Sequence, residues 1–190
     1  MPDTRTIQEL IRQIERGELT LPEFQRGYVW NRRQVSSLVT SLYRKHPTGH
    51  LLVWKTNDPT NLRGAAAGDD HQTSVLIDGQ QRLTSLYVLF NDEAPAFYEG
   101  EKLHRGLWFN IVTETFSWYQ ATTMKGQPDW IDVHKFLSSG GLNGLLERSE
   151  DKSDEKDLYV QNINRLNRLA QIKDHSYTVD QLSGDEFSME

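Results

Sequence analysis

Apolar residues recur at the spacing of an amphipathic helix in three segments of the first half of the chain. A first helix is expected to begin behind a cap at Asp3 or Thr4 and to stop at Gly17. Asn31 is the expected N-cap of a second helix, and a third is expected from about Gln80 to Asn91. The apolar residues that these helices are expected to bury are Ile7, Leu10, Ile11, Ile14, Val35, Leu38, Val39, Leu42, Leu83, Leu86, Tyr87 and Phe90.

Shorter apolar runs between and after these helices predict strands and a hairpin. Pro22 keeps Leu21 out of helical geometry, so the segment LTLPEFQRGYVW is expected to be extended. Strands are expected at 50–55, 75–77 and 177–179, and a hairpin at 106–121. A short helix is expected at 132–138 and a longer one around 158–169. A polar loop and a turn are expected at 56–74 and 140–144. Because helices and strands mix without a βαβ repeat, the pattern predicts the α+β class.

The composition narrows the class of protein. A chain of 190 residues fits one domain, and without cysteine it holds no disulfide, thiolate zinc site or cysteine nucleophile. The six histidines show no pair at metal-ligand spacing, and the Walker A, GxSxG and GxGxxG patterns are missing. There is no signal-peptide core and no apolar run approaching the roughly 18 residues of a membrane span. The sequence therefore predicts a soluble, cytoplasmic protein with no membrane partner.

The net charge of -6 is unevenly distributed along the chain. Residues 1–55 carry nine Lys or Arg against five Asp or Glu, whereas residues 56–190 carry twelve against twenty-two. The segment 25–46 has no carboxylate, and its cations are Arg26, Arg32, Arg33, Arg44 and Lys45. Such a patch can attract phosphates although the whole chain is acidic. The same run is equally consistent with a solvated helix face.

The candidate chemistry is concentrated in VLIDGQQRLTSL (75–86), a predicted strand-to-helix turn. Asp78 with Gln81 three residues later fits a capping-box variant, which accounts for both residues by backbone hydrogen bonds. That interpretation leaves Gly79 unexplained, because glycine costs a helix roughly 1 kcal/mol. In a nucleotide site, this glycine would let a phosphate approach free N–H groups, Arg82 would neutralise its charge, and Asp78 would hold magnesium or orient water. Both interpretations stay open at this point.

A second candidate segment, LPEFQRGYVW (21–30), interleaves aromatic residues with polar ones. Aromatic, Gln and Arg side chains together suit a surface that stacks and hydrogen-bonds a nucleotide. The aromatic residues Phe24, Tyr28 and Trp30 are equally suited to a core. We expect both: apolar residues anchor the loop, while Gln25 and Arg26 face the site.

These two motifs, the helix between them and PTGHLLVW (47–54) occur in an order that resembles the family named for its DGQQR motif. That family forms the N-terminal part of GmrSD-type modification-dependent (type IV) restriction enzymes. The resemblance is specific over about the first 90 residues and general from Gly106 onward. It implies a ParB/sulfiredoxin-like core, in which a small mixed sheet is flanked by helices. Residues 1–100 would form this nucleotide-binding core, and residues 101–190 a hairpin and helical extension packed on it.

The resemblance also implies an activity. Members of the family look like nucleoside triphosphatases that sense modified or phage DNA and control an HNH-type nuclease domain or partner subunit. The residues that would be catalytic are Asp78, which would also hold Mg²⁺, Gln81 and Arg82. Those that would bind the nucleotide are Gln25, Arg26, Gly79, Gln80 and Thr84. A DNA-facing surface would include Tyr28, Trp30, Arg32 and Arg33, and the oligomeric state, a homodimer included, stays open.

The sequence departs from the family pattern after the DGQQR region. The F-x-R-x-N-type motif and the histidine-rich nuclease domain that usually follow have no counterpart before Glu190. We therefore expect the chain to be truncated before a further C-terminal region and to lack nuclease activity by itself. Two alternatives stay open: a non-catalytic DNA-binding module that uses the 25–46 patch, and ParB-like phosphodiester cleavage at the DGQQR turn. The second lacks another carboxylate placed with Asp78.

Overall fold

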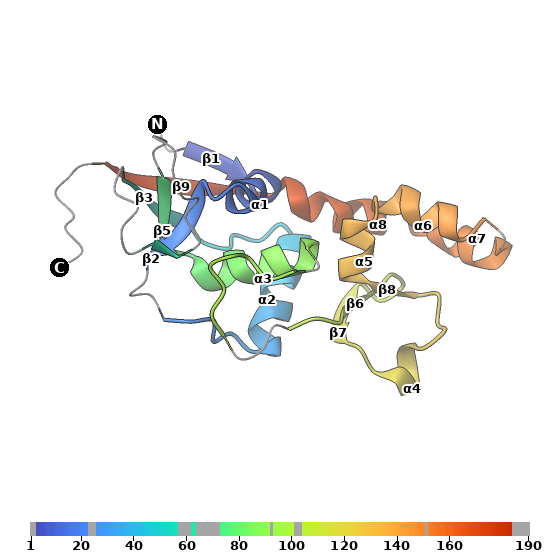
Figure 1. Ribbon diagram of the computed structural model, residues 1–190. Helices are drawn as coiled ribbons and strands as arrows, with labels where there is room; N and C mark the ends of the chain where they lie inside the picture. Colours follow the sequence, from blue (N-terminus) through green and yellow to red (C-terminus); the bar gives the residue numbers. More distant parts are fainter. Residues whose placement is uncertain are drawn as a thin grey trace.

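The computed structural model describes residues 3–22, 26–56, 62–63, 73–91, 93–100, 104–150 and 152–183. Over these residues, helices alternate irregularly with the strands of two sheets (Figure 1), which confirms the α+β class. The larger sheet lies at one end of the molecule, and the smaller sheet lies beyond the helices that pack against the larger one. No helix in the described part of the chain is long and apolar enough to cross a membrane.

The larger sheet has six strands in the order β1-β9-β3-β5-β2-β4. Their bounds are β1 Asp3–Thr6, β2 Leu19–Pro22, β3 Leu51–Thr56, β4 Leu62–Arg63, β5 Thr73–Asp78 and β9 Ser176–Ser183. The sheet is mixed, because β3 runs antiparallel to β5 but parallel to β9, and β2 runs parallel to β5. The two predicted strands at 50–55 and 75–77 are confirmed as β3 and β5, and β5 delivers Asp78 to its carboxyl end.

Three helices pack beside this sheet: α1 (Ile7–Glu15), α2 (Arg32–Tyr43) and α3 (Gln80–Phe90). The apolar residues predicted for α1 and α2 are all buried. Asn31 caps α2 as expected, in a capping box with Gln34. The predicted cap of α1 was wrong: Thr6 caps it together with Glu9, because Asp3 and Thr4 belong to the edge strand β1.

The smaller sheet has the order β7-β6-β8. Its strands are β6 Leu107–Asn110, β7 Thr115–Trp118 and β8 Trp130–Asp132, so the predicted hairpin is confirmed. Around and after it lie α4 Ala121–Met124, α5 Val133–Ser138, α6 Leu142–Arg148, α7 Ser153–Gln161, α8 Ile163–Ala170 and the short 3-10 helix η1 Gln171–Asp174. The long helix expected around 158–169 is two helices, α7 and α8, that meet at Asn162. The turn expected at 140–144 is present only at Gly140 and Gly141, because α6 begins at Leu142.

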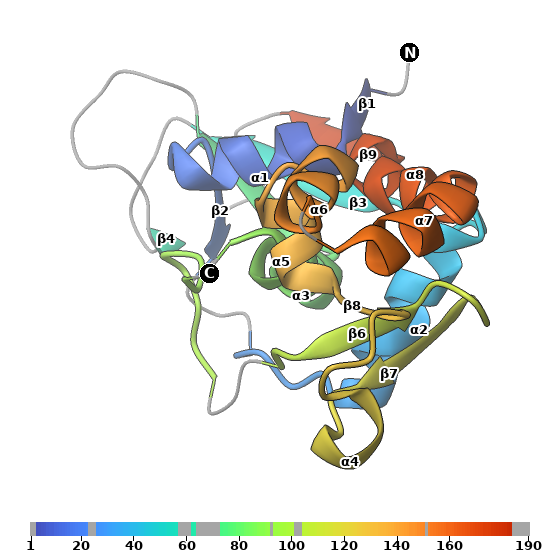
Figure 2. The same cartoon turned by 90° about the vertical axis from the view of Figure 1, so that its right-hand side faces the viewer.

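The last described strand, β9, returns to the larger sheet and lies between β1 and β3. It is longer than the strand predicted at 177–179, and it lies next to β1 in Figure 2. Its Tyr177 and Val179 are buried in the same core as the N-terminal helices. The C-terminal half therefore supplies a strand to the N-terminal sheet. The division at residue 100 stays a prediction.

Candidate functional site

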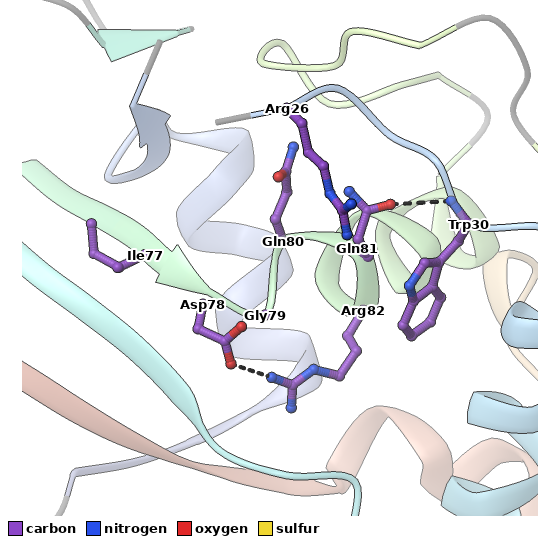
Figure 3. A pocket seen from close by; sticks show the side chains of 8 residues that line it. All are labelled: Arg26, Trp30, Ile77, Asp78, Gly79, Gln80, Gln81 and Arg82. Carbon is purple, nitrogen blue, oxygen red and sulfur yellow. Dashed lines mark hydrogen bonds and ion pairs between the residues drawn. The ribbon is translucent and has the colours of Figure 1, made fainter. Parts of the chain in front are cut away.

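A cavity of about 440 Å³ opens where β5 ends and α3 begins. Its lining comes from two stretches of chain: Arg26 and Trp30 from the loop before α2, and Ile77, Asp78, Gly79, Gln80, Gln81 and Arg82 from the turn (Figure 3). The structure thus brings the two motifs of the sequence to one place. Gln25, which was predicted to bind the nucleotide, lies outside the described residues.

Gly79 occupies a position that only glycine fits. Its φ of +104° is left-handed, and a Cβ atom there would approach a methyl carbon of Leu51 to 2.2 Å. Gly79 is the N-cap of α3, and no side chain among the described residues caps the helix. The capping box considered for Asp78 and Gln81 is therefore not formed. The first N–H groups of α3 consequently keep their hydrogen-bonding capacity for a ligand.

Asp78 and Arg82 form an ion pair on the side of the turn opposite the loop of Arg26 (Figure 3). An Nη atom of Arg82 lies 2.9 Å from the Asp78 carboxylate. The same guanidinium donates hydrogen bonds of 2.7 Å to the carbonyl oxygens of Thr48 and His50, and it lies over the ring of Tyr177. The Arg82 side chain is 16% exposed whereas that of Asp78 is 72% exposed. Arg82 therefore fastens the loop before β3 to α3, and the carboxylate of Asp78 remains open to solvent.

Gln81 fastens the other motif to the helix. Its Oε1 accepts hydrogen bonds from the backbone N–H groups of Val29 and Trp30, at 2.8 and 3.2 Å. Its Nε2 donates to the carbonyl oxygen of Gly27 at 3.2 Å. These three hydrogen bonds of the amide all go to one loop. Nothing in the spacing of the sequence indicated this contact, although an amide is the side chain that can both accept and donate to backbone.

Tyr28 anchors the same loop from inside. It is buried, its hydroxyl lies 2.8 Å from the Ser85 hydroxyl on α3, and burial raises its pKa. Its backbone N–H donates to the carbonyl oxygen of Glu99 at 2.7 Å. Ser85 and Glu99 are contacts that the sequence interpretation missed. Tyr28, predicted to face DNA, lies in the structure beneath the surface of the loop.

Arg26 and Gln80 differ from their neighbours. Arg26 is exposed, Gln80 is half-buried, and neither side chain forms a hydrogen bond or ion pair within the described part of the chain. In Figure 3 both side chains lie between the turn and the loop of Arg26: Gln80 extends from the turn toward that loop, and Arg26 extends from the loop toward the turn. Thr84, the other residue predicted to bind the nucleotide, is buried one turn further along α3.

A second, shallower groove of about 350 Å³ runs along α2 and shares Trp30 and Arg82 with the cavity. Its other lining residues are Arg33, Gln34, Ser37, Leu38, Ser41, Pro47 and Thr48. Among the residues that the structure describes, this lining contains no carboxylate. Arg32, exposed at the start of α2, lies over the ring of Trp118 at 5.2 Å. Of the residues predicted to face DNA, Trp30 and Arg33 therefore share this groove, and Arg32 lies next to it in sequence.

The donor set for a metal at the cavity is small. Asp78 is its only lining carboxylate, and no group of three or more His, Asp or Glu side chains able to hold a metal occurs among the described residues. A protein-only metal cage therefore does not fit. A magnesium ion held by one carboxylate together with phosphate oxygens and water does fit.

Two comparisons relate this chain to known proteins. A family model described as "GmrSD restriction endonuclease, N-terminal domain" matches residues 7–187. An uncharacterized protein of Methanocaldococcus jannaschii is 34% identical over 106 residues, which cover 49% of this chain and 18% of that protein. The chain therefore spans less than a fifth of the length of this relative.

Proposed function

Since the chain belongs to the family of GmrSD restriction endonuclease N-terminal domains, we propose that its cavity binds and hydrolyses a nucleoside triphosphate. The family assigns the chain to a module of a nuclease-associated restriction system. In this proposal, the state of the bound nucleotide controls an HNH-type nuclease domain or partner subunit, in response to modified or phage DNA. The observation that carries the proposal is the N-terminus of α3, which has no side-chain cap, beside two polar side chains, Arg26 and Gln80, that have no partner among the described residues.

The phosphates would lie against the first N–H groups of α3. A helix N-terminus carries a partial positive charge, and its free N–H groups point at an anion placed there. Gly79 permits the left-handed backbone of the turn, where a Cβ would overlap Leu51, and Arg26 supplies a full positive charge from the facing loop. The cavity of about 440 Å³ falls in the range of sites that hold small ligands.

Asp78 is the residue placed to act on the reacting phosphate. Its carboxylate is exposed and can orient a water molecule or hold a magnesium ion, which would neutralise phosphate charge when bound. Gln81 and Arg82 act through position: Gln81 sets the distance between the two loops, and Arg82 keeps Asp78 oriented. Thr84 supports the turn from the buried side of α3.

The test is the thermal stability of the chain with each of the four nucleoside triphosphates and magnesium. Ligand at 100 times its dissociation constant should add about 2.7 kcal/mol of stability to the wild type. Arg26→Ala and Gln80→Ala should lose this stabilisation, while Arg12→Ala, an exposed arginine on α1, should keep it. Phosphate release by Asp78→Asn then separates hydrolysis from binding. If no nucleotide stabilises the wild type more than Arg26→Ala, the proposal is contradicted.

The carboxylate-free groove along α2 supports a second function, the binding of DNA. Arg33, Gln34 and the two serines offer donors that suit a phosphate backbone, and Trp30 offers a ring beside them. Binding of this kind weakens steeply with salt. Arg33→Glu should therefore reduce both affinity for duplex DNA and its salt dependence, whereas Arg16→Glu, at the C-cap of α1, should not. Equal losses of DNA affinity in the two variants would contradict DNA binding in this groove.

A further inference from the structure

A further cleft, on the C-terminal half, is lined by aromatic and polar side chains in equal number. It has a volume of about 130 Å³, lies between the small sheet and helices α5, α6 and α7, and shares no lining residue with the cavity at the DGQQR turn. Its aromatic lining comes from Trp108, Trp130, Phe136 and Tyr159, and its polar lining from Asp132, Lys135, Ser139 and Arg148. Neither the family match nor the two sequence motifs account for it.

The pairing of β6 with β8 places the two tryptophans on one face of the small sheet. Trp108 pairs with Asp132, and Asn110 pairs with Trp130, so these side chains project to the same side. The alternate residues Phe109 and Ile131 project to the other side and are buried in the core. The small sheet thus has an apolar inner face and an outer face that carries partly exposed aromatic rings.

The polar groups of these rings are not used for folding. Within the described residues, neither the indole N–H of Trp108 nor that of Trp130 forms a hydrogen bond, whereas that of Trp118 donates to the carbonyl of Arg32. The hydroxyl of Tyr159 also has no partner there. Burial, with smaller contributions from Glu155 and Asp129, raises the pKa of Tyr159 to about 12, so this hydroxyl is a neutral donor at physiological pH.

The size of the cleft limits what it can hold. A cavity of about 150 Å³ admits one benzene ring, so this open cleft of about 130 Å³ has room for one six-membered ring whose substituents extend through its mouth, and none for a fused second ring. Aromatic walls favour stacking of a flat ring, and the indole, hydroxyl and carboxylate groups offer both donors and an acceptor to its edge. At the rim, Lys135 is 70% exposed and Arg148 is exposed, where they can meet an anionic substituent.

We propose that this cleft binds a pyrimidine base by stacking, with the attached sugar and phosphate outside it beside Lys135 and Arg148. The base inserts between the rings on the outer face of the small sheet, and its polar edge meets the side chains of Asp132 and Tyr159. Such stacking is independent of the order of bases in a strand, and it serves either a free nucleotide or a base of a single strand.

Fluorine NMR of the chain labelled with 5-fluorotryptophan tests the proposal, because each tryptophan gives one resonance that a Trp→Phe variant assigns. Titration with cytidine or thymidine monophosphate should shift the resonances of Trp108 and Trp130 and leave that of Trp118 unchanged. If the mononucleotide suffices, the ligand is a free nucleotide. If only a short pyrimidine single strand produces the shifts, the ligand is a base within a strand. If neither ligand shifts them at millimolar concentration, the proposal is overturned.

Leu145→Phe, which fills the cleft, should weaken binding by about tenfold or more, as loss of one stacking position does. Leu137→Phe adds the same volume at another partly buried position and should leave binding unchanged. Unchanged affinity in Leu145→Phe would also overturn the proposal. The resonance of Trp30 reports separately on the cavity at the DGQQR turn, so failure of the proposed function and failure of the cleft give different results.

Discussion

The residues around the cavity divide into two groups that have similar side chains but differ in whether the folded protein holds those side chains in place. Arg26, Gln80 and the first N–H groups of α3, which we call the mouth, have no protein partner in the described structure. Arg82, Gln81 and Gly79, which we call the frame, are held by hydrogen bonds or by steric fit. Each group contains one arginine and one glutamine. Residue type in a motif therefore does not reveal which side chains meet a ligand, whereas the hydrogen bonds of the folded chain do.

The strongest test of this division is Gly79→Ala. The left-handed φ costs about 1 to 2 kcal/mol, and the contact with Leu51 should add about 1 to 3 kcal/mol. Gly126→Ala is the matched control, since Gly126 has a φ of +73° but no atom within 4 Å of an added Cβ. Denaturant unfolding should show the larger loss for Gly79→Ala. Equal losses would mean that the contact with Leu51 does not constrain the turn.

A comparison of the two arginines should separate mouth from frame. Arg82→Ala removes two hydrogen bonds to carbonyl oxygens and one to Asp78, and should lower the free energy of unfolding by about 2 to 3 kcal/mol. Arg26→Ala should change it by less than about 0.5 kcal/mol, because Arg26 is exposed and has no partner among the described residues. Urea denaturation of both variants checks this. A reversed order would contradict the assignment.

The two glutamines should behave in the same way with a smaller effect. Gln81→Ala leaves the N–H groups of Val29 and Trp30 without their acceptor, and should cost about 1 to 2 kcal/mol of stability. Gln80→Ala, at the next position, should cost little stability and affect nucleotide binding instead. Hydrogen exchange at the amides of Val29 and Trp30 should accelerate in Gln81→Ala alone. Acceleration in Gln80→Ala would place it in the frame.

The smallest expected effect concerns a hydrogen-bonded group outside both regions. The Tyr43 hydroxyl, followed by Arg165 and Arg168, holds the pKa of Glu114 below its ordinary value of 4.5. A depressed pKa in the folded state means that this contribution to stability is present above pH 4.5 and is lost as the pH falls through the lowered pKa. Glu114→Gln should therefore lose less stability than the wild type on acidification below that pH. If the free energy of unfolding falls equally with pH in Glu114→Gln and in the wild type, Glu114 does not contribute stability in this way.

Much of the fold followed from the sequence because the strongest signals are local. The helical spacing of apolar residues located α1, α2 and α3, and Asn31 marked the start of α2. The cap of α1 could not be predicted, because it depends on pairing between residues 3–6 and 176–179, at opposite ends of the chain. The length of β9 could not be predicted either, because residues 179–183 pair with residues 51–55. Local spacing contains no information about that pairing.

The candidate site was predictable in location and not in detail. Two motifs in order indicated that Arg26 and the DGQQR turn meet, and Gly79 was the residue of the turn that a capping box left unexplained. The tasks of Gln81 and Arg82 could not be predicted, because their partners are backbone groups of distant loops, at Gly27 to Trp30 and at Thr48 to His50. A backbone carbonyl leaves no signature in the sequence.

The central claim is that a nucleoside triphosphate lies on the N-terminus of α3, and an amide NMR titration tests it most directly. Addition of the stabilising nucleotide with magnesium should shift the backbone N–H resonances of Gln80, Gln81 and Arg82 more than those of any other helix N-terminus, because these groups would donate to phosphate. In Arg26→Ala the same shifts should require much higher nucleotide concentrations. If the nucleotide stabilises the chain while these three resonances stay in place, it binds elsewhere and the account is contradicted.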